Sequence, residues 1–145
     1  EPINHWTHPF SSVVCETCQT QYLASMHNLS FEDQKVDAVY LAFDVDPESL
    51  AASIQSIRQL DLLGVNLSMP HKMAAVPLVD ELSPAAELIG AINTIVNHKG
   101  HLIGHNTDGI GFMRALGDIE VSIIGGTMTV IALVELLQQL LVKLP

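Results

Sequence analysis

Apolar positions along the chain fall into strand-like runs and helix-like spacings. Residues 36–45 are rich in β-branched and aromatic side chains, and residues 38–43 are continuously apolar, which is typical of a strand buried on both faces. Asp46 and Pro47 then mark a helix start, as the cap and the first helical residue. The apolar positions that follow recur at spacings of four, three and three, which predicts a helix with one apolar face. These positions are Leu50, Ile54, Ile57 and Leu60.

A second strand is predicted directly after this helix. Gly64 stands where the C-terminal cap of the helix would lie, and residues 65–69 form a short strand-like run. A strand, a helix and a second strand in succession predict parallel pairing of the two strands. Pro70 is predicted to begin a further helix that extends to about residue 76.

The middle of the chain predicts two more helices and a hairpin. Ser83 is a candidate N-cap for a short helix, with Pro84 just inside it. Residues 92–97 and 101–105 flank a turn that contains Gly100, which predicts a β-hairpin. Thr107 or Asp108 then caps a helix that continues to Leu116. Together these elements predict an α/β fold of three layers, helix, sheet and helix, with a mostly parallel sheet.

The two ends of the chain give weaker patterns. Residues 11–29 mix polar and apolar positions without a firm period, so a helix is plausible there, and residues 30–35 are predicted to be a solvated connection. After Gly117, residues 121–124 and 127–131 have strand-like composition. The leucines of residues 132–144 fall on one broad face, as in a packing helix.

Composition narrows the class of protein. The 145 residues suit one domain with a real core, and 48% of them are apolar. The formal net charge of −10 argues against a nucleic-acid partner, because counterion release needs clustered basic residues. Residues 127–144 are interrupted by Glu135 and Lys143 and are too polar to span a bilayer, so we expect no membrane partner.

The number of cysteines and the first residues of the chain indicate the cellular compartment that we expect for this protein. Only two cysteines occur, so a reducing compartment, the cytoplasm, is expected. The chain begins at Glu1, with no basic and then apolar leader, so no signal peptide is predicted. Cys15 and Cys18 form a C-x-x-C pair downstream of two histidines, which raises a zinc or redox site as a hypothesis. No helix-borne histidine pair follows, and redox pairs normally follow a strand, so we predict no metal.

Small polar residues gather at the ends of the predicted elements between residues 64 and 112. Asn66 and Ser68 lie two apart at the end of a strand and therefore point to the same side. Ligands bind beyond the carboxyl ends of parallel strands, so these two residues and Asn93 are candidate ligand-binding groups, with ordinary turn chemistry as the alternative. Lys72 and Asp108 are a candidate proton-transfer pair, because burial lowers a lysine pKa while a neighbouring carboxylate opposes that change. The alternative for these two is a solvated helix residue and a simple cap.

Three motifs together resemble one known family. They are Asn-x-Ser-x-Pro-x-Lys at 66–72, Gly-Ala-x-Asn-Thr at 90–94 and Asn-Thr-Asp-Gly at 106–109. Because the three motifs occur in this order and at this spacing, residues 36–116 resemble the substrate-binding domain of shikimate and quinate dehydrogenases. The resemblance implies an oxidoreductase of aromatic amino-acid biosynthesis that interconverts 3-dehydroshikimate and shikimate, or acts on quinate, with NADP or NAD as cofactor. A homodimer stays open as the oligomeric state.

The resemblance also implies roles for particular residues. Lys72 and Asp108 would be the catalytic pair, and Ser68, Asn93 and Asp108 would hydrogen-bond the ring hydroxyls, with Asn66 nearby. The cofactor-binding residues are not identified, because no G-x-G-x-x-G motif is present and Gly125-Gly126 reads more simply as a turn.

The chain departs from the family pattern at both ends. The opening motif of the family has two serines that hold the substrate carboxylate, and Trp6 and His8 stand at those positions here. A protonated His8 could pair with a carboxylate, whereas Trp6 would obstruct it. Residues 1–116 are predicted to form the substrate-binding and catalytic domain. Residues 117–145 are predicted to be a remnant of a Rossmann-type nucleotide domain, a packing helix, or both. A non-catalytic binding or regulatory module is the alternative function.

Overall fold

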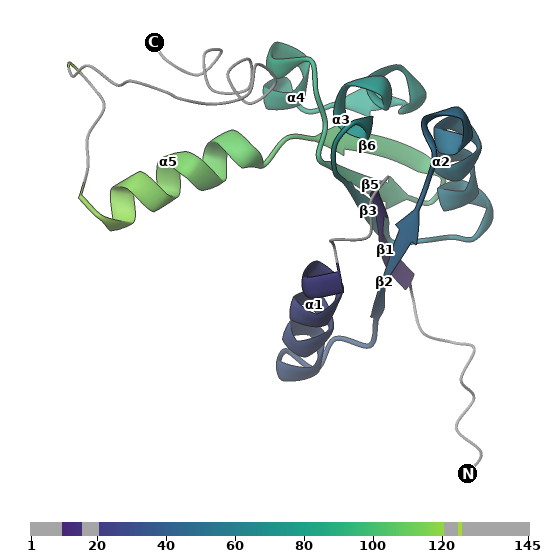
Figure 1. Cartoon of the computed structure of the whole chain (residues 1–145), viewed down its shortest axis with the longest axis horizontal. Helices are drawn as coiled ribbons and strands as arrows, with labels where there is room; N and C mark the ends of the chain where they lie inside the picture. Colours follow the sequence, from purple (N-terminus) through teal and green to yellow (C-terminus); the bar gives the residue numbers. More distant parts are fainter. Residues whose placement is uncertain (1–9, 16–20, 121–124, 126–145) are drawn as a thin grey trace.

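The computed structural model describes residues 10–15, 21–120 and 125 of the chain. The described strands form one six-stranded sheet in the order β2-β1-β3-β5-β6-β4 (Figure 1). The strands are β1 (Phe10–Cys15), β2 (Val39–Asp44), β3 (Gly64–Leu67), β4 (Glu81–Leu82), β5 (Thr94–His98) and β6 (His101–His105).

Strand directions confirm the predicted hairpin and the common direction of β2 and β3, but the predicted pairing of these two strands is wrong, because β1 is inserted between them. β1 lies between β2 and β3 and is parallel to both, and β4 is parallel to β6. β5 is antiparallel to β3 and forms the predicted hairpin with β6. Three of the five strand pairs are therefore parallel, and the fold class is the predicted α/β sandwich.

Helices cover both faces of the sheet, and α5 projects away from it (Figure 1). α1 contacts β2 on one face, and α2 packs on the opposite face through the apolar core. The described α-helices are α1 (Gln21–Asp33), α2 (Leu50–Gln59), α3 (His71–Ala74), α4 (Pro84–Ile89) and α5 (Asp108–Asp118). Two 3₁₀ turns, Pro47–Ser49 and Val76–Leu78, complete the list.

The apolar core lies between α2 and the sheet. Ile54 and Ile57 of α2 meet Val65 and Leu67 of β3 in one buried cluster, as the predicted helical spacing requires. Asn66, between those two β3 residues, points to the opposite face, because side chains alternate along a strand. The sheet therefore has an apolar face toward α2 and a polar position toward α1.

Capping follows the sequence at α4 and departs from it at α2. The Ser83 hydroxyl accepts a hydrogen bond from the Ala86 amide at 3.3 Å, and Gly90 ends α4 in the left-handed conformation, as expected of a C-terminal glycine. α2 instead ends at Gln59 with Leu60 as its C-cap, and Leu60 is 67% exposed and does not join the apolar face. The prediction that Gly64 caps this helix is wrong, because Gly64 is the first residue of β3.

Two other local predictions are also wrong. Residues 11–15 belong to a strand in the interior of the sheet, and α1 continues to Asp33 through most of the predicted connection. β2 is an edge strand, so Leu41 and Phe43 are 39% and 45% exposed instead of buried on both faces. Local composition cannot distinguish an edge strand from a central one, because strand order depends on distant pairing.

The ends of the chain are mostly outside the described residues. The structure does not describe Trp6, His8 and Cys18, or the strand-like runs at 121–124 and 127–131. The predicted remnant of a nucleotide domain therefore stays a prediction. None of the helices in the described part is both long and apolar enough to cross a bilayer.

Arg58 joins α2 to the hairpin side of the sheet. Its guanidinium lies 2.7 Å from the Asp80 carboxylate and donates to the Gly100 carbonyl at 2.9 Å. The Leu102 amide donates to the same carboxylate at 2.7 Å. The Leu102 amide and the Arg58 guanidinium hold the pKa of Asp80 below its usual range.

The substitution Gly64→Ala should destabilise the fold by about 1–3 kcal/mol, because the added Cβ would overlap the Ile95 backbone carbonyl in the facing strand. Urea denaturation measures the effect. Gly111→Ala is the matched control: Gly111 lies within α5 with nothing near its Cβ position, so alanine should stabilise that helix by up to about 1 kcal/mol. Equal midpoints for the two variants would contradict the close approach of β3 and β5.

Asp80→Asn should reduce the loss of stability on acidification. A carboxyl whose pKa is depressed in the folded state contributes stability above its unfolded pKa of about 3.9, and that contribution is lost as the pH falls through the folded pKa. Urea midpoints between pH 5 and pH 2 should therefore fall less in the variant than in the parent chain. An unchanged pH dependence would show that the carboxylate has no favourable charge interaction in the fold.

Candidate functional site

Backbone hydrogen bonds at the junction of three strands bring the predicted site residues together. The Leu67 amide at the end of β3 donates to the Asn93 carbonyl at 2.8 Å, and the Asn93 amide donates to the His105 carbonyl of β6 at 2.9 Å. The Ile92 amide donates to the Lys72 carbonyl at 2.8 Å and so ties α3 to the same point. These bonds place the end of β3, the start of β5 and the turn from β6 to α5 side by side.

Lys72 and Asp108 form an ion pair at this junction. The Lys72 ammonium (Nζ) lies 2.7 Å from Asp108 Oδ2, although the two residues are 36 positions apart in the chain. The side chains are 18% and 36% exposed, so the pair is neither sealed in the core nor fully solvated. A ligand can therefore reach both groups. Asp108 is the first residue of α5, so its side chain lies at the positive end of the helix dipole.

Asn93 connects the ion pair to the strand ends. Its side-chain amide donates to Asp108 Oδ1 at 2.7 Å and to the Thr107 hydroxyl at 2.9 Å. Its Oδ1 accepts the Thr107 backbone amide and the Thr94 hydroxyl, each at 3.1 Å. Asn93 is 8% exposed, and these bonds leave its amide a single orientation.

Asn66 joins the same network from β3. Its amide nitrogen donates to the Thr94 hydroxyl at 3.0 Å, and its oxygen accepts the Tyr40 hydroxyl at 2.7 Å. Ser68 follows the end of β3, and its hydroxyl lies 3.5 Å from the Met69 carbonyl, at the long limit of a hydrogen bond. The structure thus brings four of the five predicted site residues into one network, and the described hydrogen bonds do not join the Ser68 hydroxyl to it.

Several network residues were given no role from the sequence. Thr94, Asn106 and Thr107 lie within the recognised motifs, and Asn106 is 2% exposed, donates to the Ala91 carbonyl and accepts the Asp108 amide. Tyr40 lies 26 residues before its partner Asn66, inside an apolar strand. In the sequence, the only indication of a role for Tyr40 is its phenol group within an apolar run, because a buried tyrosine hydroxyl needs a hydrogen-bond partner.

His71 adjoins Lys72 in the sequence but does not line the site. Its side chain is 1% exposed, and its Nε2 lies 2.8 Å from the Val45 carbonyl. This bond anchors α3 to the segment after β2, so His71 supports the helix that carries Lys72.

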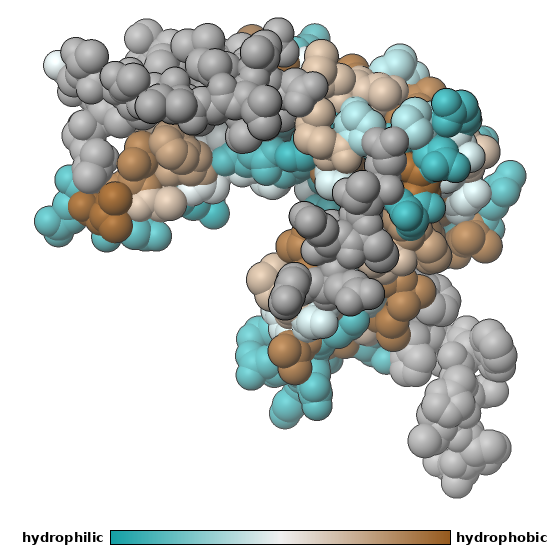
Figure 2. All heavy atoms as spheres, in the orientation of Figure 1, coloured by the Kyte–Doolittle hydropathy of each residue, from teal (hydrophilic) through white to brown (hydrophobic). Residues whose placement is uncertain are grey.

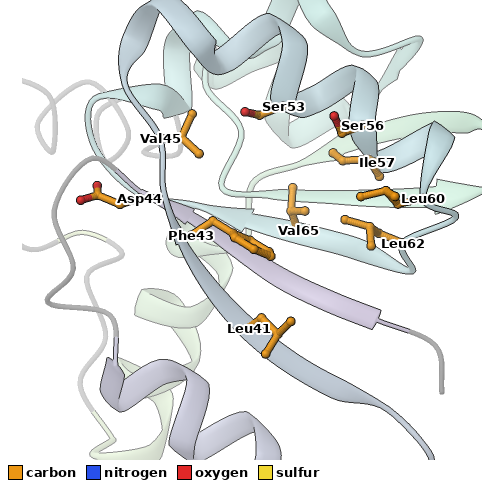
Figure 3. Close-up of a pocket in the computed structure, with 10 residues that line it drawn as sticks. All are labelled: Leu41, Phe43, Asp44, Val45, Ser53, Ser56, Ile57, Leu60, Leu62 and Val65. Atoms are coloured by element: carbon orange, nitrogen blue, oxygen red, sulfur yellow. The ribbon is translucent and has the colours of Figure 1, made fainter. Parts of the chain in front are cut away.

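An apolar groove lies on the other side of β2. It has a volume of about 240 Å³ and lies between β2 and α2 (Figure 3). Its walls include Leu41, Phe43 and Leu62, which offer few groups to a ligand rich in hydroxyls. Asn66 points away from this side of the sheet, so the groove is separate from the Lys72–Asp108 site.

Metal binding finds no support in the described part of the chain. Cys15 ends β1, Cys18 lies outside that part, and no group of three or more potential ligands gathers there. The polar network offers a cation, a carboxylate and amides, which suits hydrogen bonding to hydroxyl groups.

Comparison with known proteins confirms the resemblance that the three motifs indicated. Residues 7–95 match the profile of the shikimate dehydrogenase substrate binding domain. The shikimate dehydrogenase (NADP(+)) of Lactococcus lactis subsp. cremoris strain MG1363 is 44% identical over 131 residues, which are 86% of this chain and 46% of that protein. The corresponding protein of Streptococcus pyogenes serotype M49 strain NZ131 is 56% identical over 100 residues, 68% of this chain and 34% of its own.

A solved structure shares the fold. Shikimate 5-dehydrogenase of Listeria monocytogenes, in complex with shikimate and NAD, superposes with a TM-score of 0.77 at 41% identity. The match covers 80% of this chain and 40% of that one. This chain therefore spans less than half the length of the relatives it matches.

Asn93→Ala should release the start of α5. The variant removes the acceptor of the Thr107 backbone amide, so hydrogen exchange at that amide should accelerate about fivefold, as expected for the loss of a bond worth about 1 kcal/mol. Exchange measured by NMR reports this position directly. Asn97→Ala is the matched control, because Asn97 lies on the same hairpin but bonds to Leu62 and Gly100 instead. Similar acceleration in both variants would mean that the hairpin as a whole has loosened.

Proposed function

Since the chain belongs to the family of shikimate dehydrogenase substrate binding domains, we propose that it binds shikimate and 3-dehydroshikimate and supplies the acid–base pair for their interconversion. The observation that carries this proposal is the 2.7 Å contact between Lys72 and Asp108, held by Asn93 at a position open to a ligand. We name shikimate as the ligand because the solved structure of the Listeria relative contains it.

The ligand is recognised by groups that match a ring of hydroxyls. Asn66, Ser68 and Asn93 supply amide and hydroxyl groups at strand ends, and Asp108 supplies a carboxylate acceptor. Because the bonds within the network fix their orientations, little rotamer entropy is lost when a ligand binds. The Ser68 hydroxyl has only a 3.5 Å contact in the described structure, so it can turn toward a ligand.

Lys72 moves the proton at the reacting oxygen. When the alcohol is oxidised, its hydroxyl proton must leave as the carbon loses hydride, and in the reverse direction the ketone oxygen must gain a proton. The Lys72 amine accepts that proton in the first case, and its ammonium donates it in the second. Asp108 holds the Lys72 side chain in place through the 2.7 Å ion pair.

The described residues do not fit a nicotinamide dinucleotide. The first turn of α5 contains Gly109 and Gly111, but Asp108 at the first position of this helix would repel a pyrophosphate. We therefore assign no step that involves the cofactor to the described part of this chain. NADP or NAD, which the relatives' names carry, would bind elsewhere in a complete enzyme.

We also propose that residues 1–116 form the substrate-binding domain and residues 117–145 begin a nucleotide-binding domain. Apolar surface gathers along α5, which leads toward this boundary (Figure 2). Ile110, Met113 and Ile119 are 42%, 40% and 67% exposed. Side chains of this kind are usually covered in a complete protein, which supports a continuation of the fold beyond α5.

Lys72→Met should separate ligand recognition from proton transfer. Calorimetry should show that the chain binds shikimate, and that the variant binds it about 10–100-fold more weakly, because one charge-assisted hydrogen bond worth about 1.5–3 kcal/mol is lost. In a fusion that adds the nucleotide-binding part of the Lactococcus relative, turnover should fall by about 10²–10⁴-fold. Arg114→Met is the control, because it removes a positive charge from an exposed position of α5.

Two outcomes would contradict the proposal. Turnover of the Lys72→Met fusion close to that of the parent fusion would exclude Lys72 as the proton-transfer group. Absence of shikimate binding by a folded parent chain would exclude the substrate assignment. Binding of NADP by the chain alone would overturn our assignment of the cofactor to another part of the enzyme.

A further inference from the structure

A continuous series of side-chain hydrogen bonds runs from Tyr40 to Asp108. The Tyr40 hydroxyl donates to Asn66 Oδ1 at 2.7 Å, and Asn66 Nδ2 donates to the Thr94 hydroxyl at 3.0 Å. The Thr94 hydroxyl donates to Asn93 Oδ1 at 3.1 Å, and Asn93 Nδ2 donates to Asp108 Oδ1 at 2.7 Å. The series therefore crosses from the edge strand β2 through β3 and β5 to the start of α5.

Every link in this series has the same polarity. Each group accepts a hydrogen bond from the preceding residue and donates one to the next, and the last acceptor is the carboxylate paired with Lys72. Hydrogen bonds in such a series polarise one another, so each is stronger than it would be alone. The series is thus held at both ends, by the Tyr40 hydroxyl that donates into it and by the Asp108 carboxylate that accepts from it.

Tyr40 is held rigidly at that beginning. The side chain is 2% exposed, and its ring stacks on the His27 ring of α1 at a centroid distance of 4.3 Å. Its backbone is fixed by the Asn28 side chain, which accepts the Tyr40 amide at 2.7 Å and donates to the Tyr40 carbonyl at 2.9 Å. Burial raises the pKa of the Tyr40 hydroxyl, so the hydroxyl keeps its proton and remains a donor.

The Asn66 amide needs such a donor to fix its orientation. A primary amide has an oxygen and a nitrogen of similar size, and only its hydrogen-bond partners decide which points where. Tyr40 offers its proton to the oxygen, which leaves the nitrogen to face Thr94. Without that proton the buried amide oxygen loses its donor, the nitrogen keeps only the Thr94 hydroxyl and a 3.4 Å contact with the Asn93 carbonyl, and the bond from Thr94 to Asn93 loses the polarisation that the series gives it.

We propose that Tyr40 is a positioning residue for the site: through Asn66 and Thr94 it strengthens the hydrogen bond that Asn93 Oδ1 accepts from Thr94, and so holds the Asn93 amide more firmly on the Asp108 carboxylate that faces Lys72. The buried Tyr40 side chain does not touch the ligand, so its effect is indirect. The consequence for shikimate binding rests on the proposed function, whereas the effect on Asn93 and Asp108 does not.

Tyr40→Phe tests the proposal, because it removes the hydroxyl and keeps the ring that stacks on His27. In the ligand-free chain, the side-chain amide resonances of Asn93 should shift or split into two sets in ¹⁵N NMR spectra. Shikimate affinity, measured by calorimetry, should fall about two- to tenfold, the size expected for one neutral hydrogen bond. Shifted resonances without any shikimate binding by the parent chain would support the positioning role and contradict the proposed function alone.

A double-mutant cycle distinguishes a series from separate contacts. Thr94→Val removes the next hydroxyl in the series, so Tyr40→Phe should add no further shift of the Asn93 amide in the Thr94→Val background. Additive shifts would overturn the proposal, and so would an Asn93 amide that is unchanged in Tyr40→Phe.

A purely structural effect is excluded by a matched destabilised variant. Ile54→Val removes one methylene from the core on the opposite face, at a cost of about 0.5–1.5 kcal/mol, without touching the series. The Asn93 amide should keep its parent resonances in this variant. If Ile54→Val shifted them as Tyr40→Phe does, the effect would belong to general loosening and the proposal would fail.

Discussion

Asn93 makes hydrogen bonds to three elements of the candidate site, namely β3, β6 and the start of α5. Its backbone joins the end of β3 to the end of β6, and its side chain joins Thr94, Thr107 and Asp108. An amide has two donors and an oxygen with two lone pairs, and here both ends of the side chain are used. Because these partners come from three parts of the chain, the geometry of the Lys72–Asp108 pair depends on this one residue.

The mixed sheet explains how such a junction arises. Parallel pairing places the ends of β1, β2 and β3 at one edge, and the antiparallel hairpin of β5 and β6 brings the start of β5 and the end of β6 back to that edge. In a purely parallel sheet, strand starts and strand ends would lie at opposite edges. The change of direction between β3 and β5 therefore lets residues from both kinds of strand end meet at one site.

The sequence predicted the parts of this arrangement that have local causes. The hairpin, the α4 caps and the apolar positions of α2 follow from turn residues and periodicity, and the motif residues followed from a resemblance that the family match confirms. β1 and the exposure of β2 could not be predicted, because strand order depends on pairing between distant segments. Tyr40 escaped notice for the same reason, since its partner Asn66 is 26 residues away.

The register of β3 determines both the core and the site. Val65 and Leu67 face the apolar core, while Asn66 between them faces Tyr40 and Thr94. A shift of one residue would place an amide in the core and a valine or leucine in the polar network, so each would lose its partners. Gly64 opposes such a shift, because only a residue without Cβ can lie so close to the Ile95 carbonyl. The contact that fixes the strand in the sheet therefore also directs Asn66 toward the ligand-binding side, and stability and function constrain the same four residues.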